Sequence, residues 1–355
     1  MPLPSSLSER LLAWYRIHGR KDLPWQHSVA PYPVWISEIM LQQTQVQAVI
    51  PYFEKFMSRF VDVHALAAAP VDEVLHIWSG LGYYARARNL HHAANLVVTE
   101  HAGELPRNLD VLMTLPGIGR STAAAILALS FGDRHAILDG NVKRVLCRYH
   151  AIEGWPGASS VARRLWVIAE AHTPDADLAA YTQALMDLGA TVCVRSQPRC
   201  QACPLNDDCL ALAEGRETEL PQPKPHKPTP LRQTGFVIVR DPRGRVLLER
   251  RPPAGIWGGL WSFPECEPGA DIEAWCREHL GMAVSPVRQL ATLRHTFSHF
   301  RLDIQPTVLS IDAQGGVSIV KDSPDRQWYE IDGSERIGLA APVTRLLGEL
   351  RSLVD

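Results

Sequence analysis

Apolar residues in the first 213 positions recur at intervals of three and four, which is the periodicity of amphipathic helices. We expect breaks where proline or glycine interrupts this pattern, at Pro51, Pro70, Gly103, Pro116 and Gly117. The segments with the clearest helical periodicity are 8–17, 34–56, 72–81, 86–98, 121–131 and 162–172. The pattern therefore predicts an all-α domain over residues 1–213.

The pattern changes after a proline-rich stretch. Residues 221–230 contain five prolines, so we expect an extended linker there, within residues 214–231. Beyond it, residues 235–241, 245–251 and 302–311 have the composition of strands, with a turn at Asp241–Gly244. Residues 232–355 are therefore predicted to form a second, α+β domain.

Composition changes this picture little. A chain of 355 residues with 46% hydrophobic residues suits two globular domains. A net charge of -2 does not by itself indicate nucleic acid, although backbone amides and a local basic face can hold DNA on a neutral protein. No apolar run is long enough to span a membrane, and the N-terminal segment lacks the layout of a signal or transit peptide. We expect a cytoplasmic protein.

Four of the seven cysteines, Cys193, Cys200, Cys203 and Cys209, follow the spacing C-x6-C-x2-C-x5-C. In an intracellular protein this cluster favours a metal site over disulfides. Four thiolates suit either zinc or an iron–sulfur cluster. Zinc sites usually have two C-x2-C pairs, whereas this loop has one, so the spacing favours an iron–sulfur cluster. The other three cysteines are interpreted as core or surface thiols.

The segment Leu115–Arg120, with the sequence LPGIGR, lies between two predicted helices. Gly117 and Gly119 allow a tight turn that exposes backbone N–H groups at the start of the next helix, a geometry that binds phosphate. A plain turn between helices is the alternative interpretation.

Two carboxylates have contrasting sequence environments. Asp139 immediately precedes a predicted helix as its N-cap, and a helix N-terminus favours an ionised carboxylate. Glu38 has Trp, Ile and Met neighbours, so burial would raise its pKa. One protonated and one ionised carboxyl is a pairing that breaks glycosidic bonds. Alternatively, Asp139 is only a cap and Glu38 lies on a solvated helix face.

Taken together, these features resemble one known family. Residues 1–213 resemble the helix-hairpin-helix DNA glycosylases of the endonuclease III superfamily, through LPGIGR, an aspartate about twenty residues later, and the cysteine spacing. Within that superfamily the whole chain is most similar to the MutY family of adenine DNA glycosylases. The matching strings are LPWQ (23–26), SEIMLQQTQV (37–46), GLGYYARARNL (80–90), LDGNVKRVL (138–146) and QALMDLG (183–189).

The resemblance implies a multi-domain protein. An all-α helix-hairpin-helix glycosylase domain would carry a [4Fe-4S] loop at residues 193–209, held by the four cysteines. An α+β Nudix-like domain that recognises the lesion would follow. We expect a monomer that binds double-stranded DNA containing 8-oxoguanine:adenine or guanine:adenine mispairs.

The resemblance also implies roles for individual residues. Glu38 would protonate the adenine ring, Asp139 would stabilise the oxocarbenium-like sugar or a covalent successor to it, and Asn141 would support both. The residues implied to bind substrate or DNA are Trp25 and Gln183 in the adenine pocket, Gln43 and Tyr83 as wedges in the base stack, and Phe297, Ser298 and His299 at 8-oxoguanine. A wedge is needed because extruding a nucleotide costs stacking energy. For Tyr83 and for the 297–299 loop, ordinary packing and a hairpin tip are the alternatives.

Ser121, which together with Gly117 and Gly119 is also expected among the residues that bind substrate or DNA, stands where the lyase branch of the superfamily carries a nucleophilic lysine. Its presence favours a monofunctional glycosylase in which water completes the reaction, although Lys143 lies nearby in the sequence and could trap the aldehyde product.

The second domain departs from the active nucleotide hydrolases it resembles. Gly259 to Glu265 satisfies the opening of the Nudix box, but Glu273-Ala274 stands where Arg-Glu is required and the later acidic pair is missing. This favours a binding module over a pyrophosphatase.

The leading hypothesis is therefore a monofunctional adenine glycosylase. The alternatives are a mismatch-thymine or damaged-pyrimidine glycosylase on the same scaffold, a non-catalytic DNA-scanning module, and a nucleotide pyrophosphatase.

Overall fold

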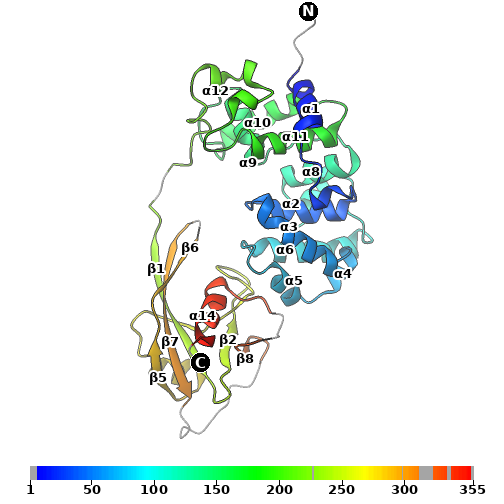
Figure 1. The fold of residues 1–355 in the computed structure, drawn as a ribbon. Helices are drawn as coiled ribbons and strands as arrows, with labels where there is room; N and C mark the ends of the chain where they lie inside the picture. Colours follow the sequence, from blue (N-terminus) through cyan, green and yellow to red (C-terminus); the bar gives the residue numbers. More distant parts are fainter. Residues whose placement is uncertain (1–5, 226–227, 298, 312–322, 334–336, 353–355) are drawn as a thin grey trace, which may run out of the picture. The chain divides into compact units, whose positions relative to one another are not determined.

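The computed structural model describes residues 6–225, 228–297, 299–311, 323–333 and 337–352. Contacts between residues divide the chain into two compact units. The first unit contains residues 1–68 and 89–226, and the second contains residues 69–88 and 227–355. Helices build the first unit, and a mixed sheet forms the centre of the second (Figure 1).

The first unit is helical, as the periodicity predicts. Its helices are α1 (Leu7–His18), α2 (Pro31–Leu41), α3 (Val46–Arg59), α4 (Val63–Ala68), most of α6 (Ala85–Glu100), α7 (Leu109–Thr114), α8 (Arg120–Phe131), α9 (Gly140–Tyr149), α10 (Ser159–His172), α11 (Leu178–Thr191) and α12 (Leu210–Ala213). Short 3-10 turns lie at Pro24–Gln26, Cys200–Ala202 and Asn206–Asp208.

The expected break at Pro51 is wrong. Pro51 lies inside α3, and the segment 34–56 is interrupted earlier, between α2 and α3, where Gln43 has a left-handed φ of 58°. Proline in a helix costs one backbone hydrogen bond. Here α3 continues past it because its apolar side, with Phe53 and Phe56, is buried.

A buried apolar cluster joins α1, α8, α9, α10 and α11. Leu11, Leu146, Tyr181 and Leu188 are among its members. Burial of a large apolar side chain contributes about 1.5–3 kcal/mol. This packing fixes the start of α9, where Leu138 and Val142 are buried on either side of Asp139.

The second unit has a mixed sheet, which agrees with the predicted α+β class. Its strands are β1 (Leu231–Arg240), β2 (Val246–Arg250), β3 (Trp261–Ser262), β4 (Glu265–Cys266), β5 (Val284–Gln289), β6 (Leu293–Thr296), β7 (Arg301–Ile311) and β8 (Arg326–Tyr329). The order is β3-β2-β1-β7-β5, while β4 pairs with β1, β6 with β7 and β8 with β2. Strands β1 and β7 are parallel, and the other named pairs are antiparallel. The helices of this unit are α5 (Val71–Trp78), α13 (Ile272–Trp275), a π turn (Cys276–Leu280) and α14 (Ala341–Arg351).

The predicted turn at Asp241–Gly244 joins β1 to β2. The Asp241 carboxylate accepts hydrogen bonds from the backbone N–H groups of Arg243 and Arg245, and Gly244 has a φ of 84°. A second hairpin joins β6 to β7, with Thr296 opposite Arg301. Within the described residues, no helix is long and apolar enough to cross a membrane.

Candidate active site

Asp139 is the N-cap of α9, as its sequence position predicts. Its side chain accepts a hydrogen bond of 2.7 Å from the backbone N–H of Val142. Burial raises the pKa of Asp139, whereas the helix amides and the charges of Arg144 and Lys143 lower it by a smaller amount. The helix N-terminus therefore lowers the pKa of Asp139, as expected, but the larger effect of burial leaves this pKa raised overall.

Glu38 lies on α2 and is half-buried. Burial, with a smaller contribution from the nearby charge of Asp139, raises the pKa of Glu38 to about 8. The two carboxyl groups, from α2 and from the start of α9, are therefore close enough to influence each other. A carboxyl group with this pKa carries a proton at neutral pH and can donate it.

Asn141 is held by contacts that the sequence did not reveal. Its Oδ1 accepts a hydrogen bond of 2.8 Å from Arg144, which also donates to the carbonyl oxygens of Gly189, at 2.6 Å, and Cys193, at 2.7 Å. A Cβ atom at Gly189 would lie 2.5 Å from the Cβ of Asn141. Only glycine therefore allows α11 to approach the first turn of α9 this closely. The signal available in the sequence was the glycine that ends QALMDLG.

Ser121 contacts the same region. Its hydroxyl oxygen accepts a hydrogen bond of 2.9 Å from the backbone N–H of Leu138, the residue before Asp139. Ser121 thus braces the segment that leads into α9. At this position, where the resemblance implies a lysine in the lyase branch, the serine therefore supports the backbone next to Asp139.

The glycine-rich hairpin joins α7 to α8. Gly117 has a φ of 83°, and its carbonyl oxygen accepts a hydrogen bond of 3.3 Å from the side chain of Gln42. Gly119 is the N-cap of α8, has no side chain to cap the helix, and has open space in the direction of a Cβ atom. The backbone amides at the start of α8 are therefore approachable by a phosphate group.

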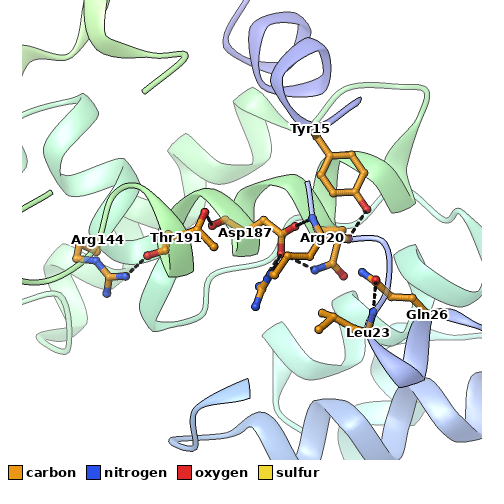
Figure 2. A network of polar contacts seen from close by, with 9 residues as sticks. Tyr15, Arg20, Leu23, Gln26, Arg144, Asp187 and Thr191 are labelled. Carbon is orange, nitrogen blue, oxygen red and sulfur yellow. Dashed lines mark hydrogen bonds and ion pairs between the residues drawn. The ribbon is translucent and has the colours of Figure 1, made fainter. Parts of the chain in front are cut away.

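The two residues implied for the adenine pocket are buried and well held. Trp25 makes an edge-on contact with Phe53 at a centroid distance of 5.4 Å. Gln183 donates from Nε2 to the carboxylate of Asp187 at 2.9 Å. Figure 2 shows Asp187 on α11 at the centre of a polar network that also receives Arg20, from the segment after α1.

The two residues implied as wedges share an unusual backbone. Gln43 and Tyr83 both adopt left-handed φ angles, 58° and 48°, which are uncommon for residues other than glycine. Both side chains are exposed, Tyr83 by 49%. Below Tyr83, the buried Arg86 donates to the carbonyl oxygens of Leu81 and Gly82 and lies 5.5 Å from the tyrosine ring. Strained, exposed residues on braced turns are typical of functional sites.

All four cysteines of the predicted cluster loop line one cavity in the first unit, together with Arg148 and apolar residues of α9 and α11. Burial, with contributions from neighbouring thiols, raises the pKa of Cys200, Cys203 and Cys209. In the part of the chain that the structure describes, no group of three or more His, Cys, Asp or Glu side chains is arranged to hold a metal ion. The four thiols are partly buried, and all of them face the same cavity.

The residues implied to contact 8-oxoguanine lie between β6 and β7. Phe297 is half-buried, and its ring centroid lies 5.2 Å from Trp257 and 4.5 Å from Phe300. His299 is exposed. Ser298 lies outside the described residues. The loop is a hairpin end, and Phe297 also packs within an aromatic cluster.

Two acidic residues near the broken Nudix box are paired with arginine. Glu265 forms an ion pair with Arg251 at 2.7 Å, and Glu249 accepts a hydrogen bond from Arg326 at 2.5 Å. Both carboxylates are therefore neutralised by arginine side chains.

Comparison with known proteins defines the class. Residues 36–171 match the HhH-GPD superfamily of base excision DNA repair proteins, and residues 235–349 match the NUDIX domain. A thermostable thymine-DNA glycosylase is 28% identical with a TM-score of 0.54, covering 58% of this chain and 95% of that one. An endonuclease III solved in a non-covalent complex with DNA is 22% identical with a TM-score of 0.51, covering 59% of this chain and 94% of that one, and shares the fold. The chain is a helix-hairpin-helix base excision repair glycosylase with a C-terminal Nudix-like domain, which confirms the predicted fold class.

The adenine DNA glycosylase of Buchnera aphidicola (subspecies Acyrthosiphon pisum) is 37% identical over 340 residues, which is 96% of both chains. The chain therefore belongs to the adenine DNA glycosylase family, and the family predicted from its motifs is confirmed. It is an enzyme, and its similarity to DNA glycosylases indicates that it binds DNA. Endonuclease III-like glycosylases commonly bind a [4Fe-4S] cluster.

Proposed function

We propose that this chain hydrolyses the N-glycosidic bond of adenine mispaired with 8-oxoguanine or guanine in duplex DNA, after the adenine is flipped out of the helix. The observation that carries the proposal is the pairing of Glu38, whose pKa is raised to about 8, with Asp139 at the start of α9. Two carboxyls with different environments can divide acid and stabilising roles.

In the proposed reaction, the Glu38 carboxyl donates its proton to a ring nitrogen of adenine. The bond between the base and the sugar breaks, and its electron pair leaves with the protonated base. Asp139 stabilises the positive charge that develops on the sugar, and Asn141 supports this arrangement. Water is the nucleophile that then adds to the sugar, because Ser121 provides no amine to form a Schiff base. The added water loses a proton to give the product.

Residues other than the carboxyl pair would bind the DNA. The amides around Gly117 and Gly119 would hold a phosphate, and Gln43 and Tyr83 would fill the space left by the flipped base. Trp25 and Gln183 would line the adenine pocket. Phe297, Ser298 and His299 would contact 8-oxoguanine, which differs from guanine on its Hoogsteen edge.

The presence of Cys193, Cys200, Cys203 and Cys209 around one cavity supports a [4Fe-4S] cluster there, for which each thiolate would be one ligand. When bound, the cluster supplies four iron–thiolate bonds that cross-link the loop. The buried Arg148 would support this site, because its guanidinium lies 3.3 Å from the Sγ of Cys193 and donates to the carbonyl oxygen of Val194.

The test of the proposed function is single-turnover base release from a panel of duplexes containing 8-oxoguanine:adenine, guanine:adenine, guanine:thymine and guanine:cytosine. Release of free adenine from the first two supports the proposal. Release of thymine alone would instead support the activity named for the thymine-DNA glycosylase of similar fold.

Iron analysis tests the cluster separately. We expect about four irons per chain and a broad visible absorbance band, both lost when the cysteines are replaced by serine. Stoichiometric zinc without iron would contradict the cluster.

A further inference from the structure

The carboxylate of Asp187 is buried and receives four hydrogen bonds. Its side chain is 1% exposed. Oδ1 accepts from Nε of Arg20 at 2.9 Å, from Nη2 of Arg20 at 2.6 Å and from Nε2 of Gln183 at 2.9 Å. Oδ2 accepts from the backbone N–H of Arg20 at 2.7 Å (Figure 2).

This arrangement fixes the orientation of the Gln183 amide. An ionised carboxylate only accepts hydrogen bonds, and the Arg20 guanidinium only donates them. The NH₂ end of Gln183 must therefore face Asp187, and its Oε1 must face away. Among the residues that the structure describes, no donor contacts this Oε1 atom, so it is available to a ligand.

Arg20, at one end of this network, lies close in the sequence to Trp25, the other residue of the proposed pocket. Gln183 and Asp187 are four residues apart on α11, on the same side of the helix. Arg20 lies just before Leu23, whose backbone N–H donates to the side chain of Gln26 at 3.2 Å (Figure 2). This bond closes the 3-10 turn that carries the buried Trp25.

We propose that Asp187 is a positioning residue that makes Gln183 present an acceptor oxygen to the base, so that the pocket selects a purine with an exocyclic amine at position 6. Arg20 holds Asp187 in this role from the opposite side. The inference rests on the proposed function, because it assumes that Gln183 faces the flipped base. It explains how a glutamine, which has both a donor and an acceptor end, can distinguish an amine from a carbonyl group.

The experiment compares adenine, hypoxanthine and unsubstituted purine as target bases, each opposite 8-oxoguanine in the same duplex. Single-turnover release rates are measured for the wild-type chain and for Asp187→Asn. Asparagine can donate as well as accept, so the Gln183 amide is free to rotate and to offer its NH₂ group to the carbonyl oxygen of hypoxanthine. We expect the ratio of adenine to hypoxanthine release to fall by about 10-fold or more, the size of one buried hydrogen bond, with purine affected least.

Three further variants separate positioning from a general structural role. Adding Gln183→Glu to Asp187→Asn restores an acceptor-only side chain and should restore the preference for adenine. In a Gln183→Ala background, Asp187→Asn should cause no further change in the ratio. Thr191→Val is the matched control, because the Thr191 hydroxyl donates to the backbone carbonyl of Asp187 and not to its carboxylate.

An unchanged ratio in folded Asp187→Asn would overturn the inference, and so would an equal loss on all three bases. If that variant does not fold, Asp187→Ser replaces it, since a serine hydroxyl can also donate as well as accept, and the same decrease in ratio is expected. Wild-type chain that releases no adenine would instead refute the proposed function.

Discussion

The carboxyl pair of the first unit and the aromatic hairpin of the second are held in place by different kinds of interaction. The Asp139 side chain accepts a hydrogen bond from the backbone N–H of Val142, and the preceding residue, Leu138, is held by Ser121. Phe297 is held by ring contacts with Trp257 and Phe300. Hydrogen bonds fix direction and charge, whereas ring contacts tolerate sliding. The proposed proton transfer depends on the first kind of support, and the proposed contact with 8-oxoguanine would tolerate the second.

The largest effect is expected at the carboxyl pair. Glu38→Gln keeps the shape of the side chain but removes the proton, so base release should slow by about 10²–10⁴-fold while mispair binding is kept. Single-turnover rates and binding titrations measure the two properties. Glu54→Gln, at an exposed position on α3, is the matched control. A near-normal rate in Glu38→Gln would remove Glu38 from the acid role.

The hairpin should respond with a change of preference. Phe297→Ala should leave base release active but lower the preference for 8-oxoguanine:adenine over guanine:adenine, by about 5- to 150-fold if a stacking contact with the base is lost. Val287→Ala, on an exposed position of β5, is the control. If both duplexes slow equally, the hairpin supports the fold and does not read the lesion.

The raised pKa of Glu38 predicts how stability depends on pH. Its ordinary value is 4.5 and its folded value about 8, so the folded chain binds more protons between these limits. Stability should therefore fall as pH rises through this window, with a contribution from Glu38 of at most about 1.4 kcal/mol per pH unit. Glu38→Gln should flatten the slope in denaturant titrations at pH 5, 6, 7 and 8. Parallel slopes for the two proteins would show that Glu38 has an ordinary pKa.

The smallest effect concerns Ser121. Ser121→Ala removes the acceptor for the Leu138 N–H and should cost about 1 kcal/mol, or roughly a 5-fold loss in rate. Ser121→Thr keeps the hydroxyl and should be close to wild type. Equal rates for Ala and Thr would show that the bond does not support catalysis.

The fold was largely predictable because its signals are local. Helical periodicity, strand composition and the Asp241–Gly244 turn are visible within short windows of sequence. Pro51 misled because the burial of Phe53 and Phe56 sustains α3. The grouping of residues 69–88 with the second unit has no signal in the hydrophobic pattern, since α5 resembles any other amphipathic helix.

The candidate site was likewise predictable only where its signals are local in the sequence. Asp139 and the hairpin glycines have recognisable local roles as caps and turns. Asp187 and Arg20 escaped notice because they are 167 residues apart in the sequence, and an aspartate within QALMDLG gives no hint of its partner. The roles of the individual site residues and the loop at Phe297 stay predictions until the experiments above are done.

The left-handed backbone of Gln43 and Tyr83 lowers the stability of the folded chain, while the side chains at these positions are proposed to serve base flipping. At such positions glycine avoids the steric strain that a side chain incurs, at the expense of greater freedom in the unfolded chain. Selection for thermal stability alone would therefore tend to erode both exposed side chains. In a directed-evolution experiment that rewards only heat resistance, these two positions are where adenine release should be lost first, with Glu38 and Asp139 still in place.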